Sequence, residues 1–163
     1  MKPLYLIGGP MGVGKTAAGK ALAALLSGSV FLDGDWCWQP EVVTPETKAM
    51  VLDNICHLLS NYLRCSAYRQ VIFTWVMHRQ AIVAEILSRL PPCRPCPVSL
   101  VCSEAELVRR LQGDIAAGVR DASVVPRSLA RLPLYQTMDT VKLDVTTLTP
   151  AETAGAICRL FPL

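Results

Sequence analysis

The sequence predicts an α/β protein in which helices cover both faces of a parallel β-sheet. Short apolar runs of strand type alternate with segments of helical periodicity along the chain, which is typical of repeated βαβ units. A glycine-rich loop joins the first apolar run to the first helical segment. The length of 163 residues and the apolar fraction of 52% suit a single domain that spans residues 1–163.

Each expected element has a local signal in the sequence. The five strands are expected at residues 4–8, 29–33, 70–75, 97–102 and 140–143. The helices are expected at residues 15–27, 45–64, 78–90, from 104 to 111 or 115, and 150–160. Two of these helices begin with a capping box, formed by Ser103 with Glu106 and by Thr149 with Glu152. The arginine-rich stretch at 113–131 is expected to be partly helical.

The loop at residues 9–16 matches the phosphate-binding pattern G-x-x-x-x-G-K-[ST] in full. Its glycines let successive backbone N–H groups point at a phosphate, and the helix that follows places its positive end on the same anion. Lys15 is expected to bridge the β- and γ-phosphates, and the hydroxyl of Thr16 is expected to reach Mg²⁺. The expected nucleotide-binding residues of this loop are Gly9, Pro10, Met11, Gly12, Val13, Gly14, Lys15, Thr16 and Ala17.

Two carboxylates, Asp33 and Asp35, flank Gly34 at the end of the second strand. Alternation along a strand would place both side chains on the same side, and Gly34 would let a ligand approach closely. Phosphoryl transfer needs one acid near the metal and one that orients the acceptor hydroxyl. The alternative is an ordinary polar turn, because Asp-Gly is a common turn pair.

These features together resemble the nucleoside-monophosphate-kinase-like group of small P-loop kinases, which includes shikimate and gluconate kinases. The resemblance rests on the glycine-rich loop, on the segment Phe31-Leu32-Asp33-Gly34-Asp35, and on the similarity of residues 143–152 to a segment near the adenine in that group. It covers essentially the whole chain. It implies the sheet order 2-3-1-4-5, an acceptor-side insert at about 36–69 and a short lid at about 113–135.

The resemblance also implies individual roles, with ATP and Mg²⁺ as cofactors. Asp33 would lie in the water shell of Mg²⁺, and Asp35 would be the base that faces the acceptor. Arg110 would stack on the adenine, near Thr146 and Thr147.

The chain departs from the group where the acceptor is bound. It reads Trp36-Cys37-Trp38-Gln39-Pro40 where gluconate kinases have Leu-His-Pro, and Thr74-Trp75-Val76-Met77-His78-Arg79 where shikimate kinases have a glycine triplet. The acceptors of those enzymes are therefore not carried over to this chain.

The expected acceptor pocket contains Trp36, Trp38 and Trp75, which are all of the tryptophans and follow the second and third strands. Aromatic faces favour a flat or apolar acceptor, although these rings could instead pack on the core. Arg79 could bind an anionic group and His78 a hydroxyl. The alternative for a histidine at a helix start is a solvated or capping role.

Five arginines lie between the fourth and fifth strands, where mobile arginines would stabilise the transferred phosphoryl group. They are Arg109, Arg110, Arg120, Arg127 and Arg131. Arg120 follows Gly118 in an expected turn, and we expect it to be catalytic. The alternative for each arginine is a place on a solvated basic helix face.

The first interpretation is thus an ATP-dependent kinase of a small molecule: a nucleoside, a nucleotide, a sugar acid or a drug-like compound. The second is an ATP-binding switch or ATPase that acts through a protein partner. The third strand ends Phe73-Thr74-Trp75 without an acid, which argues against a motor protein or a GTPase. The sequence also has no Asn-Lys-x-Asp motif of the kind found in GTPases. That absence favours adenine over guanine.

Composition limits the partners. A net charge of +3 is too small to indicate a nucleic-acid partner.

The sequence shows no signal peptide or membrane span, so we expect a cytoplasmic protein whose seven cysteines are thiols. Cys93 and Cys96 are expected in a proline-rich loop before the fourth strand, and the alternative for this C-x-x-C pattern is a redox pair.

Overall fold

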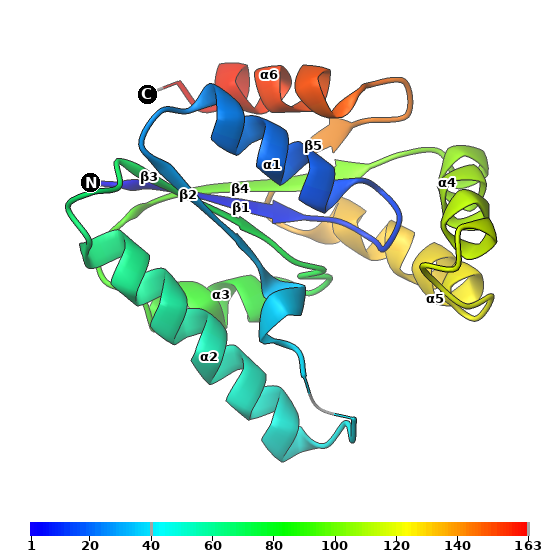
Figure 1. Ribbon diagram of the computed structural model, residues 1–163, viewed down its shortest axis with the longest axis horizontal. Helices are drawn as coiled ribbons and strands as arrows, with labels where there is room; N and C mark the ends of the chain where they lie inside the picture. Colours follow the sequence, from blue (N-terminus) through cyan, green and yellow to red (C-terminus); the bar gives the residue numbers. More distant parts are fainter. Residues whose placement is uncertain (40, 163) are drawn as a thin grey trace.

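The computed structural model describes residues 1–39 and 41–162 and has three layers, with a sheet between two layers of helices (Figure 1). Pro40, in the predicted insert, and Leu163 lie outside the described residues. The strands are β1 (Pro3–Gly8), β2 (Ser29–Asp33), β3 (Gln70–Thr74), β4 (Arg94–Val101) and β5 (Val141–Asp144). The helices are α1 (Lys15–Leu25), α2 (Pro45–Arg64), α3 (Gln80–Ser88), α4 (Glu104–Ala116), α5 (Val124–Arg131) and α6 (Pro150–Leu160), with two 3-10 helices, η1 (Gly34–Cys37) and η2 (Leu132–Thr137).

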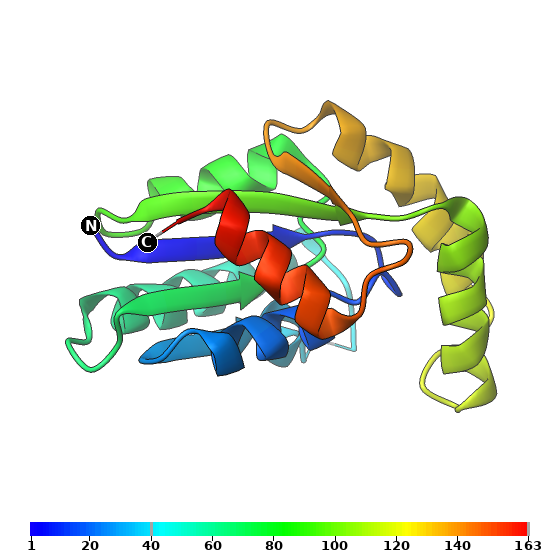
Figure 2. The ribbon, with the colours of Figure 1, turned by 90° about the horizontal axis from the view of Figure 1, so that it is seen from above.

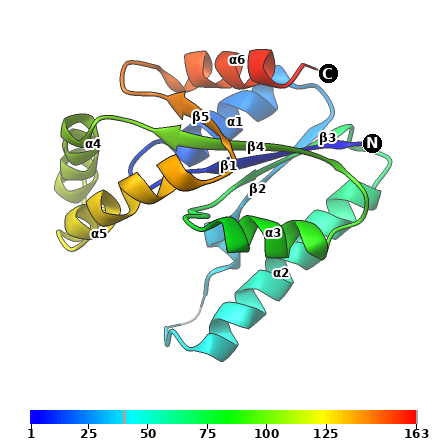
Figure 3. The same cartoon turned by 180° about the vertical axis from the view of Figure 1, so that it is seen from behind.

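The sheet has the order β2-β3-β1-β4-β5 and all of its pairs are parallel, which confirms the predicted fold class and strand order. Helices α1 and α6 cover one face, and α2 and α3 cover the other (Figures 1 and 2). Because the strands are parallel, their carboxyl ends meet at one edge, which is where ligands bind in such sheets. Helices α4 and α5 lie beyond this edge (Figure 3).

The central strands explain why this sheet needs both layers. In β1, residues Leu4–Ile7 are at most 1% exposed, and Val71, Ile72 and Phe73 of β3 are fully buried. A strand that is apolar on both faces must be covered on both faces. The core therefore fixes β1 and β3 in the middle of the sheet, and the loops that follow them lie in the middle of its carboxyl edge.

The fourth strand begins at Arg94 rather than at the predicted residue 97. Residues 93–96, with Pro95, suggested a loop, but Arg94, Pro95 and Cys96 pair with β1, and this part of β4 extends beyond β5, whose pairing begins at Val98. A proline without an N–H is tolerated where a strand has a free side. Cys96 therefore lies in a strand, and the loop predicted there was wrong.

The third helix begins at Gln80, two residues later than predicted. Met77 has a φ of 31°, and the N-cap Arg79 is extended, so the helix cannot begin earlier. His78 and Arg79 consequently lie in a loop after β3 and not on the first turn of a helix. Among the helices within residues 1–39 and 41–162, none has the length and hydropathy that crossing a membrane requires.

Candidate active site

The predicted phosphate loop joins β1 to α1 at the carboxyl edge of the sheet. Gly14 is the N-cap of α1 with a φ of 100°, a left-handed conformation that disfavours any residue with a Cβ. A Cβ on Gly12 would lie 2.5 Å from Cδ2 of Leu111 in α4. The structure thus places the whole motif between strand and helix, as a phosphate-binding loop requires.

Lys15 is a buried cation at the end of the phosphate loop, with charged side chains near it. Its Nζ donates a hydrogen bond of 2.9 Å to the carbonyl oxygen of Pro10. Burial lowers the pKa of Lys15 to about 8, with the carboxylates of Asp35 and Asp33 opposing this shift. The structure therefore gathers both predicted acids around the predicted phosphate-binding lysine.

Thr16 and Asp33 form the part of the site that suits Mg²⁺. The hydroxyl of Thr16 donates to Oδ2 of Asp33 over 2.6 Å, and Asp33 is only 5% exposed. Among the described residues, no group of three or more His, Cys, Asp or Glu side chains is arranged to hold a metal. Mg²⁺ in phosphate sites needs less, because it uses one or two carboxylates together with water and phosphate oxygens.

Thr74, which the sequence reasoning did not select, adds to this part of the site. It ends β3 as the register neighbour of Asp33, and its hydroxyl is buried without a hydrogen-bond partner in the part of the chain that the structure describes. Its Cγ2 would lie 2.7 Å from a Cβ on Gly19 of α1, so it faces the same helix as Asp33. An unpaired buried hydroxyl beside the Thr16–Asp33 pair fits a metal that keeps bound water.

Asp35 reaches the site by a route that the sequence analysis did not expect. Strand β2 ends at Asp33, and Asp35 belongs to η1, so strand alternation does not place the two acids. Instead, Oδ1 of Asp33 accepts a hydrogen bond of 3.0 Å from the backbone N–H of Asp35. Asp35 is exposed, which leaves its carboxylate open to a ligand.

Gly34 does not provide space for a ligand, contrary to the prediction. It is buried, and a Cβ there would lie 2.5 Å from Cγ of Trp75. The glycine is needed because the indole ring occupies this volume. Trp75 also packs on Phe73, with ring centroids 6.5 Å apart.

The other two tryptophans have different surroundings. Trp36 packs edge-on against Phe31 with centroids 5.4 Å apart, and remains 56% exposed. Because a Cβ on Gly19 would lie 2.5 Å from the ring of Phe31, Trp36 lies toward the α1 side of the sheet. Trp38 is partly buried against the core. Their contacts with an acceptor stay predictions.

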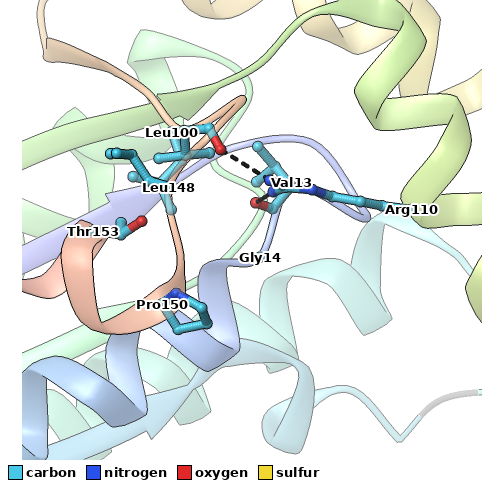
Figure 4. A pocket seen from close by; sticks show the side chains of 8 residues that line it. Val13, Gly14, Leu100, Arg110, Leu148, Pro150 and Thr153 are labelled. Atoms are coloured by element: carbon cyan, nitrogen blue, oxygen red, sulfur yellow. Dashed lines mark hydrogen bonds between the residues drawn. The ribbon is translucent and has the colours of Figure 1, made fainter.

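A pocket of about 280 Å³ lies beside the phosphate loop (Figure 4). Its walls come from the loop, β4, α4 and the segment that leads into α6, through Val13, Gly14, Leu100, Arg110, Val145, Leu148, Pro150 and Thr153. This mixture of apolar walls and one cation suits a planar base. The lining residues Val145 and Leu148 stand on either side of Thr146 and Thr147, and Thr146 itself donates to Asp144 over 2.6 Å.

Arg110 lines one side of this pocket (Figure 4), and three hydrogen-bond partners hold it. It donates to the carbonyl oxygen of Val13 over 2.7 Å, to that of Val145 over 2.9 Å, and to Glu106 over 2.7 Å. Hydrogen bonds from Arg109 and Arg110 lower the pKa of Glu106 to about 2. Arg110 therefore connects the phosphate loop to the α6 side of the pocket in a fixed orientation.

The remaining arginines separate into two groups. Arg120 and Arg131 lie close enough to lower the pKa of Lys15, and Arg120 donates to Asp114 over 3.1 Å. Arg109 points outward, with its side chain 71% exposed, and Arg127 is exposed on α5. Arg131 was one of the five candidates, but Arg110 and Arg120 were preferred to it. Helical spacing alone does not show which face of α5 is directed at the loop.

The loop of residues 75–79 lies beside the same edge. Burial lowers the pKa of His78, and the nearby charges of Arg131 and Arg79 lower it further. Within the described ranges, Nδ1 of His78 is buried and unpaired. The structure thus brings His78 and Arg131 together, a relationship that no sequence signal contained.

Comparisons with known proteins agree with this architecture. A family model described as an AAA domain matches residues 6–123. Comparison with the curated proteins gives no significant match. Among solved structures, a tunicamycin resistance protein from Deinococcus radiodurans superposes with a TM-score of 0.72 at 18% identity, covering 100% of this chain and 97% of its own.

Two named kinases have the same fold. A gluconokinase from Sinorhizobium meliloti has a TM-score of 0.70 at 22% identity, with 97% of this chain and 93% of that one covered. A shikimate kinase from Acinetobacter baumannii, solved with shikimate, has a TM-score of 0.64 at 23% identity, with 98% and 92% covered. The fold is therefore that of the small P-loop kinases which the sequence resembles. Since the family model spans well over half of the sequence, the chain belongs to the AAA domain family of P-loop proteins.

Proposed function

We propose that the protein is an ATP-dependent phosphotransferase that moves the γ-phosphate to a hydroxyl or phosphate group of a small molecule. The observation that carries this proposal is the position of Asp35. The residue is exposed, and its carboxylate lies close enough to Lys15 to raise the pKa of that lysine. Its backbone N–H donates to Asp33, which in turn accepts from Thr16. An acid at this place can face an acceptor that approaches the phosphate loop.

The nucleotide would bind along the phosphate loop with its base in the pocket beside Arg110. Backbone N–H groups of residues 9–16 would surround the β-phosphate, and Lys15 would lie between the β- and γ-phosphates. Thr16 and Asp33 would hold Mg²⁺, which when bound neutralises charge on the phosphate oxygens. Contact with triphosphate favours the charged form of Lys15, whose pKa is otherwise lowered by burial.

In the transfer step, Asp35 would orient the acceptor hydroxyl and accept its proton. The acceptor oxygen forms a bond to the γ-phosphorus while the bond from that phosphorus to the β,γ-bridging oxygen breaks, and ADP leaves. Arg120 and Arg131 would stabilise the charge that develops on the transferred group. Their shared influence on Lys15 supports this role for both.

The acceptor would lie between Asp35 and the loop of residues 75–79. Trp75, His78 and Arg79 come from that loop, and Trp38 follows η1. The two named kinases with this fold act on gluconate and shikimate, as their names state, which supports a hydroxyl-bearing small molecule as acceptor here. The proposal leaves nucleosides, nucleotides, sugar acids and drug-like compounds as candidates.

Transfer of labelled γ-phosphate to a mixed acceptor pool tests the proposal, with Asp35→Asn as the matched variant. A labelled organic product in the wild type that is lost in the variant supports a phosphotransferase. ATP binding with release of inorganic phosphate alone supports an ATPase that acts through a protein partner.

A further inference from the structure

Helix α5 and η2 follow each other without a break and direct three side chains toward the site. Ser128, Arg131 and Tyr135 are spaced so that they share one helix face. Ser128 and Tyr135 are fully buried, whereas Arg127 and Leu134 next to them on the chain are exposed. This face therefore belongs to the packed core.

The two buried hydroxyls of this face bind two different loops. Ser128 donates to the carbonyl oxygen of Met11 in the phosphate loop over 2.6 Å. Tyr135 donates to the carbonyl oxygen of Val76 in the loop after β3. Arg131 lies between these two contacts, within electrostatic range of Lys15 and of His78.

The loop that Tyr135 holds adopts an unfavourable backbone conformation. Met77 has a φ of 31° although it is not glycine, and its side chain is 1% exposed. Strained residues persist only where surrounding contacts fix them. A second contact joins the residues that directly follow these two segments: the backbone N–H of Asp139, two residues after η2, donates to Oε1 of Gln80, the first residue of α3, over 3.0 Å.

We infer that α5 and η2 form a fixed bridge between the phosphate loop and the loop of residues 75–79, and that Tyr135 is a positioning residue that holds His78 at the acceptor side. The connection between α4 and α5, which carries Arg120, lies outside this bridge. The acceptor-side role of His78 rests on the proposed function, but the bridge itself does not.

Burial of a tyrosine does not by itself require such a bond. Tyr5 is also fully buried, yet its hydroxyl has no hydrogen-bond partner among the residues described. Tyr5→Phe therefore removes a core hydroxyl without breaking a contact and is the matched control for Tyr135→Phe. Of the two substitutions, Tyr135→Phe removes a hydrogen bond to the loop, and Tyr5→Phe removes none.

Imidazole NMR titration of the whole protein tests the bridge, because the chain has two histidines. His57 is exposed on α2 and serves as an internal reference. Burial and the charges of Arg131 and Arg79 lower the pKa of His78. If the loop of residues 75–79 loosens, His78 becomes more exposed and its pKa should rise toward that of a free histidine. We expect Tyr135→Phe to raise this pKa and Tyr5→Phe to leave it unchanged.

Addition of Mg-ADP separates the bridge from the proposed function. In the wild type, phosphate beside Arg131 should shift the His78 signals, and Tyr135→Phe should weaken this response while leaving the affinity for Mg-ADP within about twofold. Failure of Mg-ADP to bind the wild type would contradict the proposed function alone.

An unchanged His78 titration in folded Tyr135→Phe would overturn the bridge. If that variant does not fold, Gln80→Ala breaks the exposed second contact and should move the His78 pKa in the same direction. An unchanged titration in Gln80→Ala would then overturn the inference.

Discussion

The hydroxyl of Thr16 and the carboxylate of Asp33 are joined by a hydrogen bond of 2.6 Å at the carboxyl edge of the sheet. The two residues come from α1 and β2 and are brought together because both elements pack beside β3. A hydroxyl beside a buried carboxylate next to a phosphate loop is a pair of oxygen ligands that suits Mg²⁺.

Asp33→Asn should therefore lower the affinity for Mg²⁺ in the complex with ATP. Residues that orient a metal typically contribute about tenfold or more to metal affinity, so the Mg²⁺ concentration for half-maximal binding should rise by at least that factor. Calorimetric ATP titration at stepped Mg²⁺ concentrations measures this. Asp53→Asn, which removes a surface carboxylate paired with Arg89, is the control, and equal behaviour of the two variants would argue against the metal role.

The stability of the nucleotide-free protein should depend on the pKa of Lys15. This pKa is lowered from 10.5 to about 8 by folding. Below pH 8, Lys15 is charged in the folded protein, and burying that charge lowers the free energy of unfolding. This cost disappears as the pH rises from 8 toward 10.5, because the buried lysine then loses its proton. At pH 7, Lys15→Met should raise the free energy of unfolding by up to about 3 kcal/mol, from about 1.36 kcal/mol per pKa unit.

Denaturant unfolding at pH 7 and pH 10 measures the effect. The difference between wild type and Lys15→Met should shrink at the higher pH, whereas the exposed Lys20 provides a control in Lys20→Met. A difference that does not change with pH would show that the charge of Lys15 is not the cause.

Arg120 and Arg131 should contribute to turnover more than to nucleotide binding. Because they act on charge that develops during transfer, Arg120→Ala and Arg131→Ala should each lower kcat by roughly a hundredfold or more, with the ATP KM changed by less than about threefold. Steady-state kinetics with an acceptor found in the labelled pool provides both constants. Arg127→Ala, one helical turn before Arg131, is the control, and unchanged turnover in either test variant would remove that arginine from the mechanism.

Glu106 should matter for nucleotide affinity although it does not line the pocket. Its carboxylate holds Arg110, and the two arginine contacts lower its pKa to about 2, so it stays charged at neutral pH. Glu106→Gln should weaken ATP binding by roughly three- to tenfold, because Arg110 loses a charged partner. Fluorescence titration with a labelled ATP analogue measures this, and Glu104→Gln on the same helix should bind like the wild type.

The sequence predicted the fold because its signals are local. Alternating apolar periodicity, capping boxes and the glycine-rich loop each depend on residues close in the chain, and they located α2 (Pro45–Arg64) and α6 (Pro150–Leu160) correctly. The error at Pro95, which was expected in a loop, arose because tolerance of proline depends on which side of β4 is paired.

The site was predicted only where a motif spans it. The unpaired hydroxyl of Thr74, the bond from Tyr135 to Val76 and the positive φ of Met77 depend on tertiary packing between distant segments. The reason given for the position of Asp35 was wrong, since a 3-10 turn and not strand alternation positions it. Only the assembled sheet reveals these relationships.

In the proposed reaction, Asp35 directs an acceptor toward the γ-phosphate of ATP. The most direct measurement is single-turnover transfer from γ-labelled Mg-ATP to a pool of nucleosides, nucleotides, sugars, sugar acids and aromatic antibiotics, with wild type and Asp35→Asn compared at equal nucleotide occupancy. We expect a labelled organic product with the wild type and none with Asp35→Asn, although both bind ATP. Equal product from both proteins, or no product from any acceptor at full ATP occupancy, would contradict it.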